Sequence, residues 1–391
     1  MTDTFIPFAQ PCIEQEEIDA VTECLRSGWL TSGPRVKEFE TQFAAAVGSG
    51  FAVACDSATA GLHLAVEAIG IQPGDRVVTT PYTFTATAEV VRYMGADPLF
   101  VDIDRDSFNI DPDLIETSLS GENTDNVKAV IPVHFAGQAC QMDRLLELAD
   151  RFDFRVVEDA AHSFPATFAG KSIGSIGDLT VFSFYATKTI ATGEGGMVTT
   201  DNEEFAERVR CMRLHGISRD VFDRYQSNKP SWYYEVIAPG YKYNMPDTAA
   251  ALGLEQLKKA ERFRRRREEI ALRYTQELAD MPVGLPARVR QDDVHSWHLY
   301  VLQLGLEDLR IGRDKFIEQM AERGVGTSVH FIPLHLHPYW RDRYDLKPQD
   351  FPVSYDVYQR AVSLPIYPSM TDANVETVIA AVQSVLERAA K

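Results

Sequence analysis

Lys188 and Asp159 are the residues whose types and spacing most clearly suggest chemistry in this sequence. Asp159 ends the apolar run RVVED, and Lys188 follows 29 residues later in the small-residue stretch ATKTIATGEGG. A lysine amine can form a Schiff base with an aldehyde, and an acid beside a pyridine nitrogen keeps that nitrogen protonated. With His162 as a flat side chain to stack on a ring, these are the groups that pyridoxal phosphate needs.

Each of these residues also has an ordinary structural interpretation. An acid at the end of a strand often belongs to a turn, a lone histidine is more often a hydrogen-bonded core residue, and a lysine can extend along the surface. Burial would instead lower the pKa of Lys188 and leave its amine nucleophilic. The combination of Lys188 with Asp159, rather than either residue alone, favours the catalytic interpretation.

Strand and helix patterns alternate over the part of the chain that contains these residues. Residues 14–27 and 36–47 have helical periodicity, residues 51–55 predict a buried strand, and further strands alternate with helical segments. This order predicts an α/β fold with a mostly parallel, doubly wound sheet. Asp159 would lie at the carboxyl end of a strand, where such sheets bind ligands.

The pattern changes after Asn244. Residues 247–278 predict a long helix that we expect to be kinked or broken, and the end of the chain predicts a helix capped by Thr371 or Asp372. We therefore predict a large domain over residues 1–256 and a smaller C-terminal α/β domain over residues 257–391.

Composition narrows the class of protein. The net charge of −18 argues against nucleic acid or an anionic membrane as the main partner. No apolar run approaches the roughly 20 residues of a membrane span, and the first residues do not resemble a secretory leader. The five cysteines form no CxxC pair, which is typical of reduced thiols in a cytoplasmic protein.

The stretch SATAGLHLA, residues 57–65, joins a predicted strand to a predicted helix. Free N–H groups at a helix N-terminus together with a hydroxyl form an anion site. An ordinary helix cap by Ser57 or Thr59 is the better interpretation of this stretch alone. The anion-site interpretation is supported only because Lys188 and Asp159 imply a cofactor with a phosphate nearby.

Two further clusters favour structural interpretations. His330, His335 and His337 are interrupted by prolines and match no zinc spacing, so we expect no metal site. The run RFRRRREE, residues 262–269, predicts a solvated helix face with i,i+4 ion pairs. A minor alternative is that one of its arginines reaches a nucleotide diphosphate.

Taken together, the motifs of this sequence resemble those of the DegT/DnrJ/EryC1/StrS sugar aminotransferases. The resemblance implies a fold type I, aspartate-aminotransferase-like architecture that binds pyridoxal phosphate. The matching stretches run nearly from end to end: SGWLTSGP, SATAGLHLA, PGDRVVTTPYTFTATA, LFVDID, IPVHFAGQ, VEDAAHSF, FSFYATKTIATGEGGMV, RLHG, GYKYNMPDTAAALGLEQL, GVGTSVHFIPLHLHPYW and SLPIYPSMTD.

The resemblance implies a role for each matching residue. Lys188 corresponds to the Schiff-base lysine and Asp159 to the partner of the pyridinium nitrogen. His162 takes the stacking or O3′-side position, and Phe84 matches the aromatic residue on the other face of the ring. The residues that match the cradle of the 5′-phosphate are Ala58, Thr59 and Ser183.

One motif departs from the family pattern. Many relatives read GYNYRM and supply an asparagine to the phosphate from the second subunit. Here Lys242 stands at the asparagine position and Asn244 where arginine is usual, so both are candidates for that contact. The resemblance implies a homodimer with a shared active site, and residues 217–239 are a candidate for the segment that crosses to the partner.

The implied activity is that of a transaminase. It would move an amino group from glutamate, leaving 2-oxoglutarate, to the keto group of a nucleotide sugar, for cell-surface or secondary-metabolite glycans. GYKYN and DAAH look most like the branch that makes UDP-4-amino-4-deoxy-L-arabinose for lipopolysaccharide, so a UDP-4-keto sugar is favoured. Thr31, Tyr185 and His330 are the candidate residues of the sugar pocket.

Three alternatives stay open at this point. A pyridoxal-phosphate-dependent sugar dehydratase of the same family carries histidine in place of the lysine, and Lys188 argues against it. The chain could instead be a non-catalytic regulator that binds the cofactor on the same fold. The third alternative is an α/β protein that binds a nucleotide phosphate without pyridoxal phosphate.

Overall fold

The computed structural model describes residues 5–121, 126–217, 234–288, 290 and 292–391. Its central sheet has seven strands, in the spatial order β1-β9-β8-β5-β4-β2-β3: β1 (Phe51–Cys55), β2 (Arg76–Thr79), β3 (Asp97–Phe100), β4 (Val127–Val130), β5 (Arg155–Asp159), β8 (Leu179–Ser183) and β9 (Gly196–Thr200). Strand β9 is antiparallel to both of its neighbours, and the other neighbouring strands are parallel. The prediction of a mostly parallel sheet is therefore confirmed.

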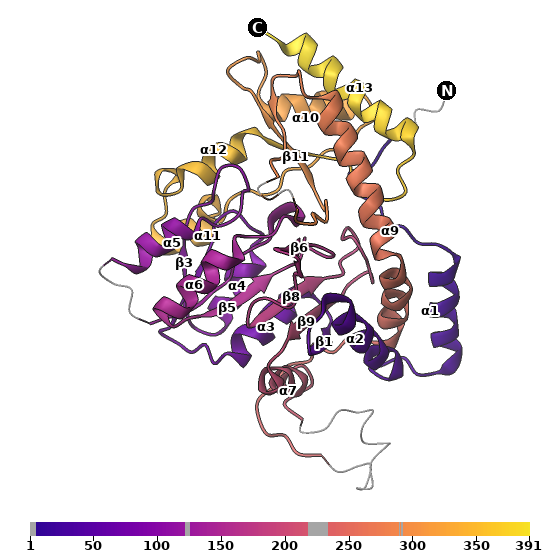
Figure 1. Ribbon diagram of the computed structural model, residues 1–391, viewed down its shortest axis with the longest axis vertical. Helices are drawn as coiled ribbons and strands as arrows, with labels where there is room; N and C mark the ends of the chain where they lie inside the picture. Colours follow the sequence, from indigo (N-terminus) through magenta and orange to yellow (C-terminus); the bar gives the residue numbers. More distant parts are fainter. Residues whose placement is uncertain (1–4, 122–125, 218–233, 289, 291) are drawn as a thin grey trace.

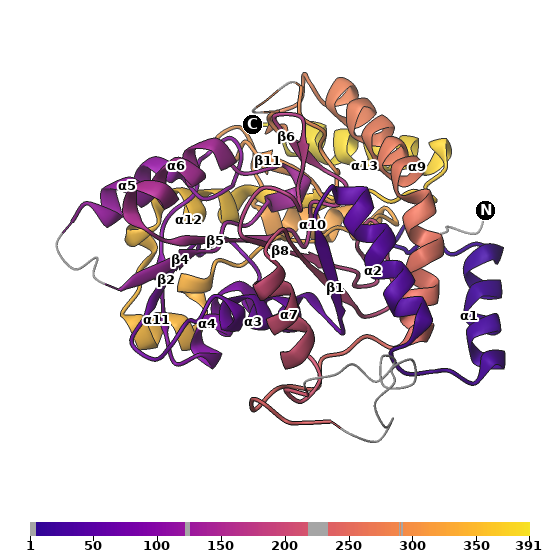
Figure 2. The same ribbon diagram turned by 60° about the horizontal axis from the view of Figure 1, so that its bottom comes forward.

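Helices cover both faces of this sheet. Figure 2 shows α5 (Pro112–Leu119) and α6 (Met142–Phe152) on one side and α3 (Ala58–Ala68), α4 (Ala86–Tyr93) and α7 (Glu203–Met212) on the other. Successive residues of a strand point to opposite faces, so Val156 belongs to one core and Val157 to the other. The result is a three-layer α/β/α arrangement with one hydrophobic core on each face.

A second, smaller sheet lies beyond this arrangement, toward the top of Figure 1. It consists of the antiparallel strands β10 (Val283–Gly284), β11 (Tyr300–Leu304) and β12 (Ala361–Leu364). Helices α10 (Arg313–Glu322) and α13 (Asp372–Ala389) pack into its core. The Thr371 side chain caps α13 by accepting a hydrogen bond from the Asn374 N–H group, as the sequence predicted.

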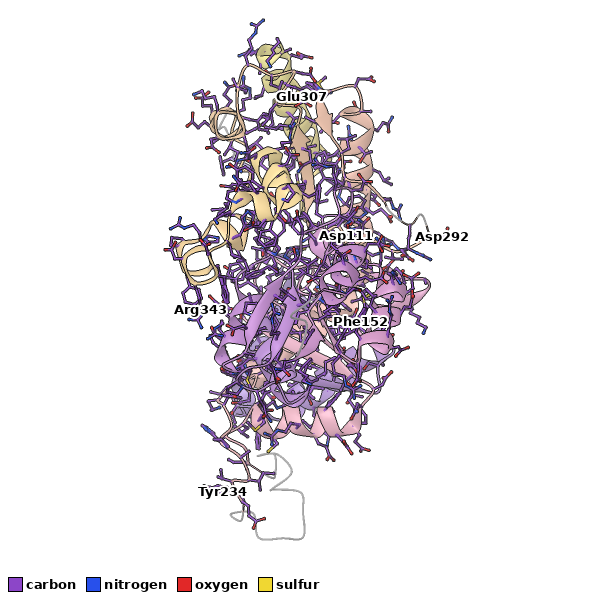
Figure 3. The ribbon with its side chains drawn as sticks, turned by 90° about the vertical axis from the view of Figure 1, so that its left-hand side faces the viewer. Asp111, Phe152, Tyr234, Asp292, Glu307 and Arg343 are labelled. Atoms are coloured by element: carbon purple, nitrogen blue, oxygen red, sulfur yellow. The ribbon has the colours of Figure 1, made fainter. Side chains whose placement is uncertain are left out.

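The N-terminal segment and several further elements pack around these two sheets, and among them α2 (Pro34–Val47) contributes Phe39 and Phe43 to the core of the large sheet. The N-terminal segment packs against the smaller part of the molecule, because Ile6 forms an isolated bridge with Val325 and both lie in the core of the smaller sheet. Figure 3 places Glu307 and Tyr234 at opposite ends of the molecule. The other elements are α1 (Gln15–Ser27), β6 (Thr167–Phe168), β7 (Lys171–Ser172), α11 (Pro338–Tyr344) and α12 (Pro352–Arg360). Among the helices of the described residues, none combines the length and the apolar character that a membrane span requires.

Helix α9 (Asp247–Glu277) connects the two parts of the molecule (Figure 1). Phe263 in its first half packs in the core of the large sheet, and Ile270 in its second half packs in the core of the small sheet. The expected break is wrong, because the helix is continuous from Asp247 to Glu277 and its span contains no proline. A kink stays a prediction. The predicted domain boundary at residues 256 and 257 falls inside this helix and stays a prediction.

The arginine run on α9 differs in part from the solvated face that we expected. Arg265 is exposed and pairs with Glu261, as predicted. Arg264 and Arg267 are buried, because the helix passes between packed elements on more than one side.

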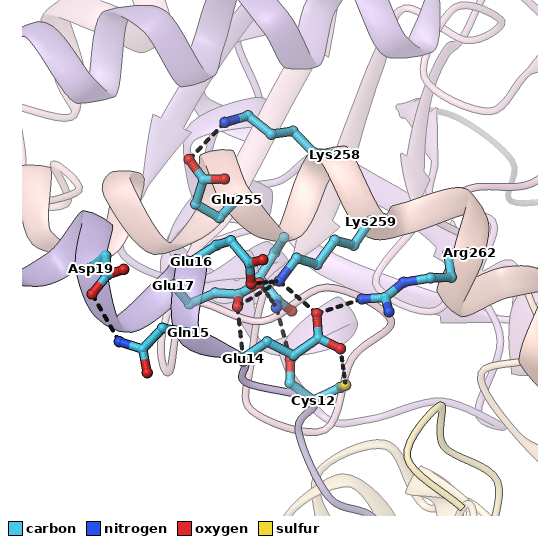
Figure 4. Close-up of polar contacts among 11 residues, drawn as sticks. Cys12, Glu14, Gln15, Glu16, Glu17, Asp19, Glu255, Lys258, Lys259 and Arg262 are labelled. Carbon is cyan, nitrogen blue, oxygen red and sulfur yellow. Dashed lines mark hydrogen bonds and ion pairs between the residues drawn. The ribbon is translucent and has the colours of Figure 1, made fainter.

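Charged residues hold α1 against α9. Figure 4 shows the Lys259 ammonium among three carboxylates, with Glu14 and Glu17 at 2.8 Å and Glu16 at 3.0 Å. Arg262 also pairs with Glu14, and the hydrogen bonds from these two cations lower the pKa of Glu14 to about 2.

Asp247, the first residue of α9, fastens the start of α2. Its carboxylate accepts hydrogen bonds from the backbone N–H groups of Gly33 (2.8 Å), Val36 (3.0 Å) and Arg35 (3.1 Å). The first N–H groups of a helix have no partner within the helix, and a negative charge is favourable at that end. A side chain from a distant part of the sequence therefore caps α2.

We predict that Asp247→Ala lowers the free energy of unfolding by about 2 kcal/mol, because buried N–H groups lose their acceptor. Asp247→Asn keeps one acceptor oxygen and should cost less. Urea unfolding followed by circular dichroism would measure both losses. Equal losses in the two variants would contradict a capping role.

Candidate active site

Asp159 lies at the carboxyl end of β5 and is buried. One of its carboxylate oxygens accepts a hydrogen bond from the Thr87 hydroxyl at 2.8 Å, and the other accepts one from the Ala161 N–H group at 3.1 Å. Burial raises the pKa of Asp159, while these two hydrogen bonds and the positive charge of Lys188 lower it. Thr87, in α4, is a site residue that the sequence did not single out, because hydroxyl residues are common at the starts of helices.

Lys188 lies in the turn that links β8 to β9, and its side chain is half-buried. Its ammonium forms no hydrogen bond within the part of the chain that the structure describes. Burial lowers the pKa of Lys188 to about 8, with Asp159 raising it and Arg267 lowering it further. The structure thus brings the amine and the acid into one electrostatic unit, with a fraction of the amine uncharged near neutral pH.

His162 provides a flat, neutral surface beside this pair. The Ala136 N–H group donates a hydrogen bond to Nδ1 of His162 at 3.3 Å, so the neutral ring carries its proton on Nε2. Burial holds the pKa of His162 well below its usual range, and Lys188 and His330 lower it further. The ring stacks on Phe331, with the ring centroids 5.8 Å apart and the planes at 21°.

The C-terminal part of the chain supplies two more histidines. The His298 ring lies 4.3 Å from the His162 ring, measured between centroids. His330 shares a 2.9 Å hydrogen bond with the Ser363 hydroxyl, and burial together with Lys188 lowers its pKa to about 4. His330 was a candidate from the sequence, whereas His298 and Ser363 were not. Ser363 opens the stretch SLPIYPSMTD that matches the family, but neither side chain was assigned a role from the sequence.

The start of α3 shows the ordinary cap that the sequence offered, and its use as an anion site stays a prediction. Ser57 caps this helix by accepting a hydrogen bond from the Ala60 N–H group at 3.1 Å, which leaves the N–H groups of Ala58 and Thr59 available for a ligand. Gly196 approaches so closely that an added Cβ atom would lie 2.6 Å from the Ser57 carbonyl. This approach places the end of β8 beside the helix, because Ser183 pairs with Gly196.

Lys242 and Asn244 lie beside the start of α3 in the same chain. The Asp56 N–H group donates a 2.8 Å hydrogen bond to the Tyr243 carbonyl between them. Lys242 donates a hydrogen bond to the Asn244 side chain, which in turn donates to the Ser32 hydroxyl. A contact from either residue to the phosphate of a partner subunit stays a prediction. Most of residues 217–239, the candidate crossing segment, lies outside the described residues.

The other candidates differ in their closeness to Lys188. The Tyr185 carbonyl accepts a hydrogen bond from the Lys188 N–H group at 2.9 Å, and the Tyr185 side chain is 47% exposed. Phe84 is 60% exposed, and its ring lies 6.2 Å from the Phe331 ring that stacks on His162. Thr31 is exposed, and its carbonyl accepts from the Asp247 N–H group, so it belongs to the loop before α2.

These groups fit pyridoxal phosphate. The unbonded amine of Lys188 suits an aldehyde, the buried carboxyl of Asp159 suits a protonated ring nitrogen, and the neutral ring of His162 suits a ring face. The free N–H groups at the start of α3 suit a phosphate. The groups come from elements that converge at the carboxyl ends of the parallel strands.

Comparisons with known proteins identify the family that this chain resembles. The model of the DegT/DnrJ/EryC1/StrS aminotransferase family matches residues 11–383. The spore coat polysaccharide biosynthesis protein SpsC of Bacillus subtilis is 50% identical over 386 residues, which cover 98% of each chain.

Solved structures share the whole fold. The putative sugar aminotransferase Spr1654 of Streptococcus pneumoniae, in its PMP form, has a TM-score of 0.90 and 32% identity, covering 98% of this chain and 99% of its own. It has also been solved in its PLP form. Helicobacter pylori PseC, an aminotransferase involved in the biosynthesis of pseudoaminic acid, has a TM-score of 0.90 and 28% identity, covering 98% and 100%.

We predict that an amine-selective reagent modifies Lys188 of the cofactor-free protein with a midpoint near pH 8. Asp159→Asn removes the negative charge that raises the pKa of Lys188, so the midpoint should move to lower pH. Peptide mass spectrometry across a pH series would measure the modified fraction, with the exposed Lys258 as the reference. A midpoint that rises in the Asp159→Asn protein would contradict the proposed coupling.

Proposed function

This chain belongs to the DegT/DnrJ/EryC1/StrS aminotransferase family, and we propose that it moves an amino group from glutamate to the keto carbon of a nucleotide-linked sugar. Members of this family use pyridoxal phosphate, and it is the cofactor of this chain. The observation that carries the proposal is the Lys188 amine, which has no hydrogen-bond partner among the described residues, a pKa of about 8 and a buried acid beside it.

In this proposal Lys188 has two tasks. Its Nζ atom first holds the cofactor covalently and, once released, accepts a proton from Cα of the amino donor. In the second half of the reaction Nζ delivers a proton to the sugar carbon. When bound, pyridoxal phosphate supplies a protonated ring that delocalises the electrons left by the broken C–H bond.

The neighbouring residues keep these steps aligned. Asp159 balances the proton on the ring nitrogen, and Thr87 fixes the orientation of the Asp159 carboxylate. His162, kept neutral by burial, covers one face of the ring, and Phe84 is proposed to cover the other. The phosphate is held by Ala58, Thr59 and Ser183, where the helix start and the end of β8 meet.

We further propose that the active enzyme is a homodimer and that Lys242 or Asn244 completes the phosphate site of the partner. In the single chain these two side chains already interact beside Asp56, at the start of the phosphate-binding turn. The support for a contact across the dimer is the family motif, in which this stretch supplies the phosphate contact from the second subunit.

The sugar is proposed to be a UDP-4-keto sugar of cell-surface glycan synthesis. SpsC is named for the biosynthesis of a spore coat polysaccharide, and PseC is involved in the biosynthesis of pseudoaminic acid, which supports a sugar substrate. The support for the UDP-4-amino-4-deoxy-L-arabinose branch is the pair of motifs GYKYN and DAAH. His330 and Tyr185 lie near Lys188 and are the favoured contacts, and Thr31 is the third candidate.

A coupled assay tests this function. We expect the purified protein, loaded with pyridoxal phosphate, to release 2-oxoglutarate from glutamate over many turnovers only when a keto sugar is present, and to release about one equivalent per active site without it. The panel would contain UDP- and dTDP-linked 4-keto and 3-keto sugars. Lack of activity with every sugar would refute the proposal, and turnover of a sugar without release of 2-oxoglutarate would indicate a dehydratase.

We predict that Lys188→Ala lowers kcat/KM by at least about 10²-fold, because the proton-transferring amine is lost. Lys258→Ala, which removes an exposed lysine that pairs with Glu255, is the control and should retain activity. Unchanged turnover in the Lys188→Ala protein would remove Lys188 from the mechanism.

A further inference from the structure

Arg267 differs from the other arginines of the run on α9. Arg264 and Arg265 each pair with Glu261, and Arg266 pairs with Glu269. Arg267 is only 2% exposed, yet no acid pairs with it in the described ranges of the chain. A buried positive charge without a negative partner is costly, so this arginine calls for an explanation.

The hydrogen bonds of Arg267 use one side of its guanidinium. Nη1 donates to the Ile366 carbonyl at 2.6 Å and, at longer range, to the carbonyls of Trp297 (3.3 Å) and His298 (3.4 Å). Nε is buried without any partner in the described structure. Nη2 also forms no hydrogen bond there and is absent from the buried unpartnered atoms, so it reaches accessible space.

The unused atoms form the edge that recognises carboxylates. Nε and Nη2 of an arginine point in the same direction and can donate two parallel hydrogen bonds to one carboxylate. Arg264, one turn earlier on the same helix, uses this edge for Glu261, with distances of 2.9 Å from both nitrogens. In Arg267 the same edge is free.

Arg267 also lies close to the proposed reaction centre. Its charge acts on Lys188 and on His298, lowering the pKa of both. His298 packs on His162, whose ring lies beside Lys188. Burial lowers the pKa of Arg267 itself to about 10, so the guanidinium still carries its charge at neutral pH.

We propose that the Nε–Nη2 edge of Arg267 binds the carboxylate on Cα of the amino donor, and the matching carboxylate of the keto-acid product. The inference rests on the proposed function, because it assumes an amino acid as donor. This carboxylate is attached to the carbon that carries the reacting amine, so it must lie close to Lys188. A nucleotide diphosphate is separated from the keto carbon by the sugar ring and has no such requirement.

Direct binding tests the proposal without catalysis. Isothermal titration calorimetry of the pyridoxal phosphate form would compare 2-oxoglutarate with 4-oxopentanoate, in which a methyl group replaces the carboxylate beside the keto group. We expect the wild-type protein to bind 2-oxoglutarate more tightly. Arg267→Gln should weaken 2-oxoglutarate by about 10- to 100-fold and leave 4-oxopentanoate unchanged.

Arg264→Gln is the matched control. It removes a buried arginine from the same helix, but one whose edge is already occupied by Glu261. Any general loosening of α9 should appear in this variant as well, whereas the preference for 2-oxoglutarate over 4-oxopentanoate should persist. Arg267→Lys keeps the charge and loses the two-pronged edge, and should give an intermediate loss of 2-oxoglutarate affinity.

The outcomes separate this inference from the proposed function. If the wild-type protein neither binds 2-oxoglutarate nor turns over glutamate, the proposed donor is wrong and the inference fails with it. If the wild type binds 2-oxoglutarate and Arg267→Gln binds it equally well, the inference alone is overturned. Weaker binding of UDP with unchanged 2-oxoglutarate binding would also overturn it and would assign Arg267 to the nucleotide.

A second measurement uses the wild-type protein and covers the case in which the variants do not fold. A crystal structure of the pyridoxal phosphate form soaked with 2-oxoglutarate would locate the carboxylate beside the keto group. We expect this carboxylate to lie within hydrogen-bond distance of Nε and Nη2 of Arg267. A carboxylate bound elsewhere, with Nε of Arg267 still without a partner, would contradict the proposal.

Discussion

The site depends on the balance of charge around the Lys188 amine. Desolvation favours the neutral amine, the buried carboxyl of Asp159 favours the ammonium, and the guanidinium of Arg267 again disfavours it. Because Asp159 and Arg267 are buried and Lys188 is half-buried, their interactions are stronger than they would be at the surface. Three nearby histidines add no positive charge, since burial keeps His162, His298 and His330 neutral. The pKa of an amine that must act as base and as acid is thus held near neutral pH.

Helix α9 makes this balance of charge possible, because it packs in the cores of both sheets and so holds the two parts of the molecule against each other. Asp159 and Lys188 come from the large sheet, and His298 and His330 come from the smaller part of the chain. The helix contributes Phe263 to one core and Ile270 to the other, and Arg267 lies between these two positions. The helix is also tied to other elements, through Asp247 to α2 and through Lys259 to α1. Small displacements of the two parts would change the distance between Arg267 and Lys188.

The features that could be predicted from the sequence are those that depend on local patterns and on family motifs. The strand over residues 51–55, the cap at Thr371 and the meeting of Lys188 with Asp159 all follow from apolar runs, turn residues and family motifs. Thr87, His298 and Arg267 could not be predicted, since their proximity to the site depends on how distant segments pack. Arg267 is the last of four consecutive arginines, residues 264–267. Only the packing of α9 in the folded chain distinguishes it from the other three. A break in α9 was expected because of its length, but the helix is continuous and contains no proline.

The single reversed strand of the large sheet has a consequence for how far Lys188 can travel. Because β9 runs antiparallel to β8, the segment between them starts and finishes at the same end of the strands, with Ser183 paired to Gly196. A parallel strand in that place would require a crossover connection to the opposite end of the strands. Lys188 would then lie in a longer segment that is not closed at the carboxyl end of β8. Both ends of the segment are therefore fixed by the sheet. The backbone of Lys188 is constrained, and the reach of its amine is set by rotations of the side chain.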